Sequence, residues 1–261
     1  MELGLKDRAV VVTGASKGIG LACVHAFAAE GARVAMVSRS RANLDAALAA
    51  MPPSAHRPVA IAADLVRADE AARAIAEAER ALGAIDVLVN SAGAARRHPP
   101  DELTAQAWHD AMDAKFFSYV HPTDLVVKAM GRRGRGAIVN IVGQGGKVAN
   151  PVHLPGGAAN AALMLATAGL AAAYASKGVR VNAINPGATL TTRVEEGLAA
   201  ESRMTGLPPD ELLKRMTQRI PLGRLGTPEE VARVAVFLAS DAASYVSGAI
   251  VPMDGASTPV I

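Results

Sequence analysis

The sequence has few aromatic residues and a single cysteine. Aromatic side chains make up 3% of the 261 residues, which argues against the stacking platforms that bind single-stranded nucleic acid. One cysteine cannot form an intrachain disulfide and supplies no zinc cluster, so we expect no metal site. The N-terminal stretch MELGLKDRAVVV does not resemble a signal peptide, and the apolar runs look too short or too amphipathic to span a bilayer. We therefore expect a soluble, cytoplasmic protein with no membrane partner.

A large excess of charge of one sign is also missing. The chain has 27 Lys and Arg residues against 24 Asp and Glu, which gives a formal net charge of +3. The basic residues are scattered apart from two short clusters, at 96–97 and 132–135. We interpret these clusters as solvated loop charge, and if they act, an anionic cofactor or substrate is favoured over nucleic acid. We expect no nucleic-acid partner.

What the sequence does contain is a regular alternation of short β-branched apolar runs with alanine-rich helical segments. This alternation is typical of βαβ units in a parallel sheet with right-handed crossovers, and nearly continuous apolar strands indicate helices on both faces. The predicted strands are Ala9–Thr13, Arg33–Val37, Pro58–Ala62, Val87–Asn90, Ala137–Val142, Val179–Ile184 and Ala249–Pro252. The predicted helices are Gly18–Glu30, Arg41–Met51, Ala68–Leu82, Gln106–Met130, Asn160–Ala175 and Pro228–Leu238.

No repeat or linker divides the chain, so we expect one domain over residues 1–261. The least regular stretch is 188–221, which we read as two short helices separated by Pro208-Pro209. We interpret this stretch as a lid over a substrate site.

The strongest motif is the turn Thr13-Gly14-Ala15-Ser16-Lys17-Gly18-Ile19-Gly20, which follows the first predicted strand and opens a helix. Its three glycines permit a tight turn and a close approach of the backbone to a pyrophosphate. The start of the helix then supplies N–H groups and a favourable dipole for the phosphates. The turn predicts a dinucleotide site.

The GxxxGxG spacing of this turn resembles that of the short-chain dehydrogenase/reductase family. Further similarities run almost end to end: Asp64-Leu65, Asn90-Ser91-Ala92-Gly93, Arg180-Val181-Asn182-Ala183-Ile184-Asn185-Pro186-Gly187, Pro221-Leu222-Gly223-Arg224 and Pro228-Glu229-Glu230-Val231-Ala232. The resemblance implies an α/β, three-layer Rossmann-type doubly wound fold with seven parallel strands in the order 3-2-1-4-5-6-7. It also implies an oxidoreductase with a nicotinamide cofactor, a small carbonyl or alcohol substrate, and a homo-oligomer, either tetramer or dimer.

The residues around the second strand favour NADP(H) over NAD(H). The position where an NAD site places a carboxylate for the ribose 2′-hydroxyl is Ser38, which carries no charge to repel a phosphate. Arg39 and Lys17 together are suited to clamp a 2′-phosphate. The expected cofactor-binding residues are Gly14, Ser16, Lys17, Gly18, Ile19, Gly20, Arg39, Asp64, Leu65, Asn90, Ala92, Gly93, Pro186, Gly187, Thr189 and Thr191.

The catalytic positions that the resemblance implies are occupied by other residue types. The family uses a Ser, a Tyr with a Lys four residues later, and a supporting Asn. The flanking matches place Gly143 at the Ser position, Gly156 at the Tyr position, Asn160 at the Lys position and Lys115 at the Asn position. The nearby Tyr174-Ala175-Ser176-Lys177 has the wrong Tyr–Lys spacing, and we interpret it as an exposed helix end.

Two hypotheses follow. In the first, the site is rewritten: Lys115 supplies a cation from the opposite wall, His153 acts as the proton donor, Asn160 binds a ribose hydroxyl, and Gln144 orients the substrate oxygen. In the second, the chain is a catalytically silent nicotinamide-nucleotide-binding homologue, such as a subunit or sensor. A lyase or isomerase on the same scaffold has no residue-level support. The first two hypotheses both predict NADPH binding, so turnover must decide between them.

Overall fold

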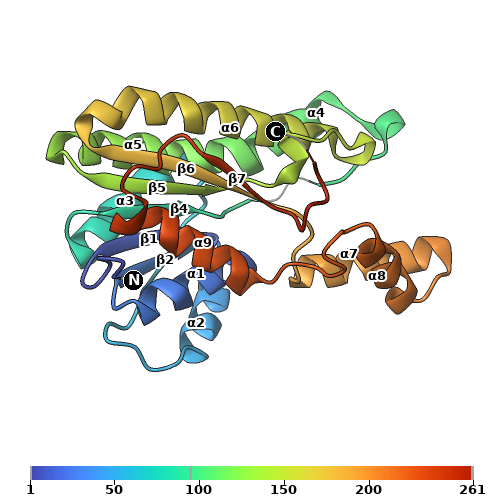
Figure 1. The fold of residues 1–261 in the computed structure, drawn as a ribbon, viewed down its shortest axis with the longest axis horizontal. Coiled ribbons are helices and arrows are strands. Elements are labelled where there is room, and N and C mark those ends of the chain that lie inside the picture. Colours follow the sequence, from blue (N-terminus) through green and yellow to red (C-terminus); the bar gives the residue numbers. More distant parts are fainter. Residues whose placement is uncertain (1, 94–95, 260–261) are drawn as a thin grey trace.

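The computed structural model describes residues 2–93 and 96–259. A seven-stranded sheet forms its centre, in the order β3-β2-β1-β4-β5-β6-β7, and every neighbouring pair is parallel. The predicted fold class, strand order and single domain are confirmed (Figure 1). The strands are β1 (Ala9–Thr13), β2 (Arg33–Ser38), β3 (Val59–Ala62), β4 (Val87–Asn90), β5 (Gly136–Ile141), β6 (Val179–Pro186) and β7 (Ile250–Met253).

Helices cover both faces of the sheet, as the apolar strands predict. The helices are α1 (Gly18–Ala29), α2 (Arg41–Ala49), α3 (Ala68–Leu82), α4 (Ala105–Ala111), α5 (Ser118–Arg133), α6 (Leu154–Tyr174), α7 (Thr192–Thr205), α8 (Pro209–Gln218) and α9 (Pro228–Ala239). One hydrophobic cluster joins the sheet to α1, α2 and α9, and a second joins its other face to α3, α5 and α6. The order reverses between β1 and β4, and in sheets of this kind ligands bind at the carboxyl ends of the strands near such a switch point.

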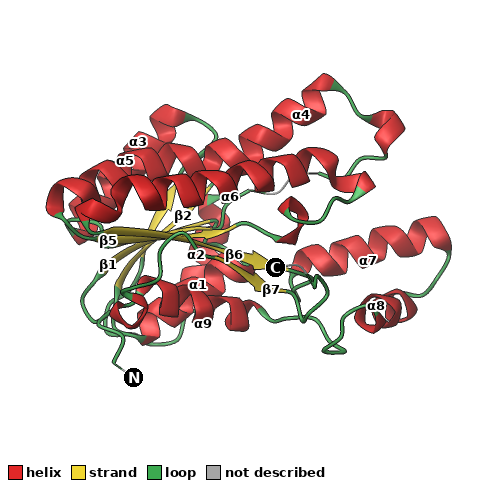
Figure 2. Ribbon diagram, turned by 45° about the horizontal axis from the view of Figure 1, so that its top comes forward, coloured by secondary structure: helices red, strands yellow, loops and turns green. Residues whose placement is uncertain are grey.

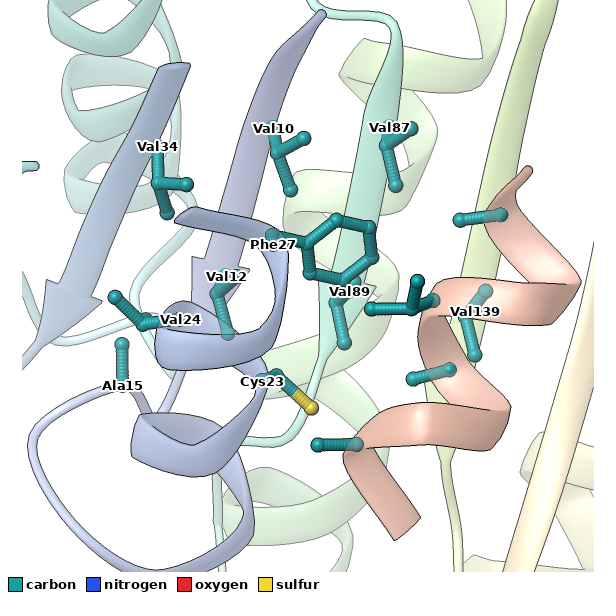
Figure 3. Packing of buried hydrophobic residues seen from close by; sticks show 14 of the residues in the cluster. Val10, Val12, Ala15, Cys23, Val24, Phe27, Val34, Val87, Val89 and Val139 are labelled. Atoms are coloured by element: carbon teal, nitrogen blue, oxygen red, sulfur yellow. The ribbon is translucent and has the colours of Figure 1, made fainter. Parts of the chain in front are cut away.

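The core between the sheet and α1 is made of small and medium apolar side chains. Phe27 packs over Val10 and Val89, and the cluster continues sideways to Val139 of β5 (Figure 3). The sulfur of Cys23 lies in the same cluster, and burial raises the pKa of its thiol to about 12. The lone cysteine is therefore a protonated core residue.

Two predicted helices have different boundaries in the structure. The prediction that α6 begins at Asn160 is wrong: the helix begins at Leu154, so Gly156 lies inside it. Pro155 in the first turn, where its missing N–H costs nothing, and the alanines that follow favour this early start. The expected single helix over 106–130 is instead α4, a π-helical turn at Met112–Phe117 and α5. Because Pro122 has no N–H, it cannot donate to the carbonyl one turn earlier, and irregular hydrogen bonding is expected there.

The stretch 188–221 contains the two predicted short helices, α7 and α8, which extend away from the sheet beyond the end of β6 (Figures 1 and 2). By length and composition alone, one helical segment, 151–177, is apolar enough to cross a membrane. In the structure its main helix, α6, packs against β6 and forms part of one helical layer over the sheet.

Candidate active site

Two glycines at the turn between β1 and α1, Gly14 and Gly20, have no room for a side chain. Gly14 has a φ of +64°, and a Cβ atom on it would lie 2.6 Å from the carbonyl oxygen of Ser91. A Cβ atom on Gly20 would overlap the carbonyl oxygen of Gly14. Only glycine satisfies these two positions, and the turn keeps the compact backbone that a diphosphate requires.

The first turn of α1 has no capping side chain among the described residues, as is also the case for α3, α6, α7 and α8, whereas Ser40, Thr104 and Thr227 cap α2, α4 and α9. Backbone N–H groups at a helix start need an acceptor, and an anion can supply it. Ser16 shares a hydrogen bond of 3.0 Å with Ser38 at the end of β2, which connects the turn to the neighbouring strand. This arrangement fits a bound phosphate.

The residues expected on the adenosine side differ in exposure. Lys17 and Arg39 are exposed, and no ion pair joins either side chain to a carboxylate in the described part of the chain. Asp64 accepts a hydrogen bond of 3.3 Å from the N–H of Val66, and Leu65 is buried. The cations are thus accessible to an anionic ligand.

Asn90 is buried in a polar network rather than exposed to a cleft. Its amide nitrogen lies 2.9 Å from both Thr123 Oγ1 and Asn140 Oδ1. The network continues from Asn140 Nδ2 to Thr167 Oγ1, also at 2.9 Å. The Asn90 side chain therefore joins β4 to β5 and the helices above them, and a cofactor contact from this residue would have to come from its backbone.

The loop after β4 rests on the helical turn that holds Lys115. Thr13 Oγ1 accepts hydrogen bonds from the N–H groups of Ser91 and Ala92, at 3.1 and 3.3 Å. Gly93 has a φ of +81°, and a Cβ atom on it would overlap the carbonyl oxygen of Ala114. The two segments therefore touch directly, which brings the expected cofactor loop next to Lys115.

Lys115 lies at the carboxyl end of β5. Its Nζ is 3.1 Å from the Tyr119 hydroxyl and 3.2 Å from the carbonyl oxygen of Ile141, and the Tyr119 hydroxyl donates to that same carbonyl at 2.6 Å. Lys115 is half-buried and Tyr119 is buried. Sequence reasoning missed Tyr119, although its position four residues after Lys115 on a helix was a usable signal.

The structure brings His153 and Asn160 together around the glycines that follow β5. A Cβ atom on Gly143 would lie 3.4 Å from Asn160 Nδ2, and one on Gly145 would lie 3.2 Å from His153 Cδ2 and 3.5 Å from Asn160 Nδ2. Asn160 is 5% exposed, and its amide oxygen has no hydrogen-bond partner among the described residues. Gly156, also buried, shares a face of α6 with Asn160.

Gln144 contacts the C-terminal segment. Its amide nitrogen donates to Asp254 Oδ2 at 3.3 Å and also to the hydroxyl of Thr258. Sequence reasoning did not identify Asp254 or Thr258 as site residues, because about a hundred residues separate them from Gln144.

The loop after β6 closes the site on the side of the glycine turn. The N–H of Gly187 donates to the carbonyl of Met253 at 3.0 Å, and buried Thr189 donates to the carbonyl of Gly187 at 3.2 Å. A Cβ atom on Gly18 would lie 3.5 Å from the Thr191 methyl group. Thr191, the residue that precedes α7, therefore faces the glycine turn.

In the described ranges, no group of three or more His, Cys, Asp or Glu side chains is placed to hold a metal ion.

The motif Tyr174-Ala175-Ser176-Lys177 was predicted to be an exposed helix end. Its last three residues are exposed, whereas Tyr174, at the end of α6, is half-buried and packs against the hydrophobic core. The ammonium of Lys177 lies 4.9 Å from the ring centre of Tyr174.

The family model, the two relatives and the solved structure described next are all reductases or dehydrogenases. A family model described as enoyl-(acyl carrier protein) reductase matches residues 14–258. The chain is 39% identical over 256 residues to a galactitol 2-dehydrogenase (L-tagatose-forming) of Cereibacter sphaeroides, covering 97% of this chain and 96% of that protein. It is 39% identical over 261 residues to a D-threitol dehydrogenase of Mycolicibacterium smegmatis, covering 97% and 94%. The crystal structure of L-sorbose reductase from Gluconobacter frateurii, complexed with NADPH and L-sorbose, is similar with a TM-score of 0.93 at 28% identity, covering both chains fully.

Proposed function

The chain belongs to the short-chain dehydrogenase/reductase family, and we propose that it is an NADP(H)-dependent oxidoreductase that interconverts an alcohol and a carbonyl on a small polyhydroxylated substrate. The observation that carries the proposal is the glycine turn before α1, where close backbone packing and uncapped N–H groups fit a dinucleotide diphosphate. The relatives named above support the substrate class, because two are dehydrogenases of sugar alcohols and one structure holds a ketose.

The preference for NADP(H) is argued from charge. Ser38 ends β2 with a neutral hydroxyl that shares a hydrogen bond with Ser16. The residue after Ser38 is Arg39 and the residue after Ser16 is Lys17, and both of these cations are exposed. A ribose 2′-phosphate at this place would gain two cations, whereas a ribose hydroxyl would find no carboxylate at residue 38 to bind. The NADPH complex of L-sorbose reductase is in keeping with this choice.

The proposed proton transfer depends on residues of this chain that replace the family's Ser, Tyr and Lys. When bound, the nicotinamide supplies or accepts the hydride. Lys115, held by Tyr119 and the Ile141 carbonyl, places a cation next to the cofactor loop, where it stabilises negative charge on the reacting oxygen. His153 is the proton donor and acceptor, because its ring lies with Asn160 beside the glycines that follow β5. Asn160 offers its amide oxygen, which has no hydrogen-bond partner among the described residues, to a hydroxyl of the cofactor ribose.

The surrounding structure completes the proposal. Helices α7 and α8 form the substrate lid, because the segment that leads into α7 already faces the phosphate turn through Thr191.

A homo-oligomer, tetramer or dimer, is supported by apolar side chains on the surface such as Leu165, which is 77% exposed on α6. Light scattering measures the oligomeric state.

The alternative is a silent NADPH-binding homologue. The resemblance supports it, because the positions that it implies for the family's Ser and Tyr hydroxyl groups are Gly143 and Gly156, which have no side chain. Loss of a positioned general acid costs a factor of about 10²–10⁴ in rate, which is enough to silence ordinary carbonyl reduction unless another group replaces it.

The deciding experiment combines cofactor binding with turnover. Calorimetric titration should show tighter binding of NADPH than of NADH, and Arg39→Ala should weaken NADPH selectively. Cofactor-linked turnover is then measured with galactitol, D-threitol and L-sorbose for wild type, Lys115→Met and His153→Ala. Lys128→Met and His109→Ala are matched controls, since Lys128 and His109 are exposed on α5 and α4.

Three outcomes are informative. A loss of about 10²-fold or more in kcat for both site variants, with normal controls, supports the rewritten site. NADPH binding without turnover of any of the three substrates supports the silent homologue. Failure of well-folded protein to bind either nucleotide overturns both.

A further inference from the structure

A charged cavity lies at the amino ends of the central strands. It has a volume of about 180 Å³, and its walls are the segment before β1, the starts of β4, β5 and β6, and the end of α9. In a parallel sheet all amino ends lie at one edge, whereas the glycine turn and the reaction centre follow the carboxyl ends of β1 and β5. The cavity is therefore separate from the proposed active site.

Arginines outnumber carboxylates around this cavity. Its charged lining residues are Arg8, Asp86, Arg135, Arg180 and Asp241. A fourth arginine, Arg133, has its Nη2 atom 3.8 Å from Asp86 Oδ1. Four guanidinium groups thus surround two carboxylates, and the excess of positive charge attracts an anion.

Arg180 has no terminal N–H group to offer a ligand. Its Nη1 and Nη2 atoms donate at 2.7 to 3.2 Å to carbonyl oxygens at and after the end of α9, which belong to Leu238, Ala239, Ser240 and Val246. A cation at the end of a helix complements the helix dipole and satisfies the last carbonyls. Arg180 therefore has a structural role in the wall of the cavity.

Arg8 and Arg135 do have donors to offer. Arg8 donates through Nε to the carbonyl oxygen of Gly4 at 3.1 Å. Its terminal nitrogens lie 3.9 Å from Asp86 Oδ1 and 3.5 Å from Asp241 Oδ2. Arg135 Nη2 also lies 3.5 Å from Asp86 Oδ1. These separations make ion pairs but are too long for good hydrogen bonds, so the terminal N–H groups of both arginines can donate to a ligand in the cavity.

Asp86 supplies a buried acceptor. Its side chain is 13% exposed, and its Oδ2 atom accepts a hydrogen bond from the N–H of Ala9 at 3.1 Å. Its Oδ1 atom is buried and accepts no hydrogen bond in the part of the chain that the structure describes, although three arginines surround it. A buried carboxylate oxygen without a donor is costly, so a ligand with an O–H group is favoured here.

We propose that this cavity binds inorganic hydrogen phosphate, with Arg8 and Arg135 donating to the phosphate oxygens and a phosphate O–H donating to Asp86 Oδ1. The ligand must carry negative charge, acceptor oxygens and a proton to donate, and hydrogen phosphate has all three at neutral pH. The volume of the cavity equals that of about six water molecules at about 30 Å³ each, which is enough for one tetrahedral oxyanion.

The acceptor at Asp86 selects among tetrahedral anions of similar size. Sulfate has no proton to donate at neutral pH. A phosphate monoester loses its last proton with a pKa of about 6, so at neutral pH it also lacks the donor. Either of these anions would place its oxygens against the Asp86 carboxylate. The site should therefore prefer inorganic phosphate to both.

Calorimetric titration at about pH 7.5 tests the proposal with phosphate, sulfate and glycerol 3-phosphate at one fixed ionic strength. NADPH is present, so that phosphate does not occupy the glycine turn. The variants are Arg135→Gln and Asp86→Asn, which keeps an oxygen for the N–H of Ala9 and turns the other oxygen into an amide donor. Arg132→Gln is the matched control, because Arg132 is exposed on α5 and does not line the cavity.

Two or three hydrogen bonds to charged groups predict a Kd for phosphate on the order of 1 mM in the wild-type protein. Sulfate and glycerol 3-phosphate should bind about tenfold more weakly. Arg135→Gln should weaken phosphate about fivefold or more, with the control unchanged. Asp86→Asn should remove the preference for phosphate over sulfate, because its amide donates to either anion, whereas a merely structural role of Asp86 leaves that preference intact.

Thermal melts give a second measurement. A ligand that binds only the folded state raises the melting temperature as its concentration rises. Phosphate should do so in wild type and in Arg132→Gln, and much less in Arg135→Gln. If Asp86→Asn does not fold, Arg135→Gln and the three anions decide the question by themselves.

Three results overturn the inference: no phosphate binding by the wild-type protein, equal binding of phosphate and sulfate, or wild-type affinity for phosphate in Arg135→Gln. The outcome does not depend on the proposed function, because the two sites lie at opposite edges of the sheet. A protein without turnover can still bind phosphate here.

Discussion

Replacing Gly143 by alanine should destabilise the protein, because its backbone conformation is almost exclusive to glycine. Gly143 has a φ of +120° and a ψ of 149°. For an L-residue this region costs about 1–3 kcal/mol. The new Cβ atom would also lie 3.4 Å from Asn160 Nδ2, which is an ordinary contact. Strain in the backbone therefore dominates, and we expect the free energy of unfolding to fall by about 1–3 kcal/mol.

Gly169→Ala is the matched control. Gly169 lies within α6, and a Cβ atom there meets nothing within 4 Å. In a helix the same substitution removes flexibility from the unfolded chain, so we expect a gain of about 0.5–1 kcal/mol. The opposite signs separate backbone strain from a general effect of adding a methyl group.

Reversible denaturation in urea measures the free energy of unfolding, and a thermal melt then checks it. For a domain of this size, each kcal/mol lost from the free energy of unfolding lowers the thermal midpoint by about 2–4 °C. Light scattering checks that all three proteins have the same oligomeric state. The reasoning is refuted if Gly143→Ala is as stable as wild type. If Gly143→Ala is destabilised as expected, Gly143→Ser would not simply restore the serine that the family resemblance implies at this position, because the loop would have to change its path first.

Three further predictions concern single side chains. Tyr119→Phe removes the hydroxyl that binds Lys115 and the Ile141 carbonyl. We expect the free energy of unfolding, measured in urea, to fall by about 1–3 kcal/mol and the pH–rate profile to be displaced from that of wild type. An unchanged profile would argue that Tyr119 does not position Lys115. Arg224 lowers the pKa of Glu230 from 4.5 to about 2 by hydrogen bonding. A lowered carboxyl pKa stabilises the folded state above pH 4.5, and this stability is lost as the pH falls from about 4.5 to about 2. Glu230→Gln should therefore flatten the acid limb of the curve of melting temperature against pH, and parallel curves would contradict it. Cys23, with a pKa of about 12, should resist iodoacetamide at pH 8 until the protein unfolds, as measured by mass spectrometry; labelling of the folded protein would refute its assignment to the core.

The outline of the fold could be predicted from the sequence because it depends on local patterns. Apolar runs such as Ala9–Thr13 and Val87–Asn90 form buried strands with the predicted bounds. Boundaries failed where local propensity was misleading. The helix predicted to begin at Asn160 begins at Leu154, and its first turns include glycine where packing is tight: a Cβ atom on Gly157 would lie 2.8 Å from the carbonyl oxygen of Gly145.

The candidate site was predicted only in part. His153 and Asn160 do lie together, as their separation of seven residues on and next to one helix allows. Tyr119 has a helical spacing from Lys115, but no spacing rule shows that both reach the Ile141 carbonyl. That contact depends on how the π-helical turn packs against β5.

By itself, the sequence determined the glycine turn and the strand–helix alternation, because backbone sterics and hydrophobic periodicity act over a few neighbouring residues. The order of the strands was predicted only through the family resemblance. The tertiary structure decided which distant groups meet: Gly93 with Ala114, Lys115 with Ile141, and Gln144 with Thr258. Such pairs form only after the strands have paired and the helices have packed, since a hydrogen bond between side chains requires their separate segments to be held within about 3 Å of each other.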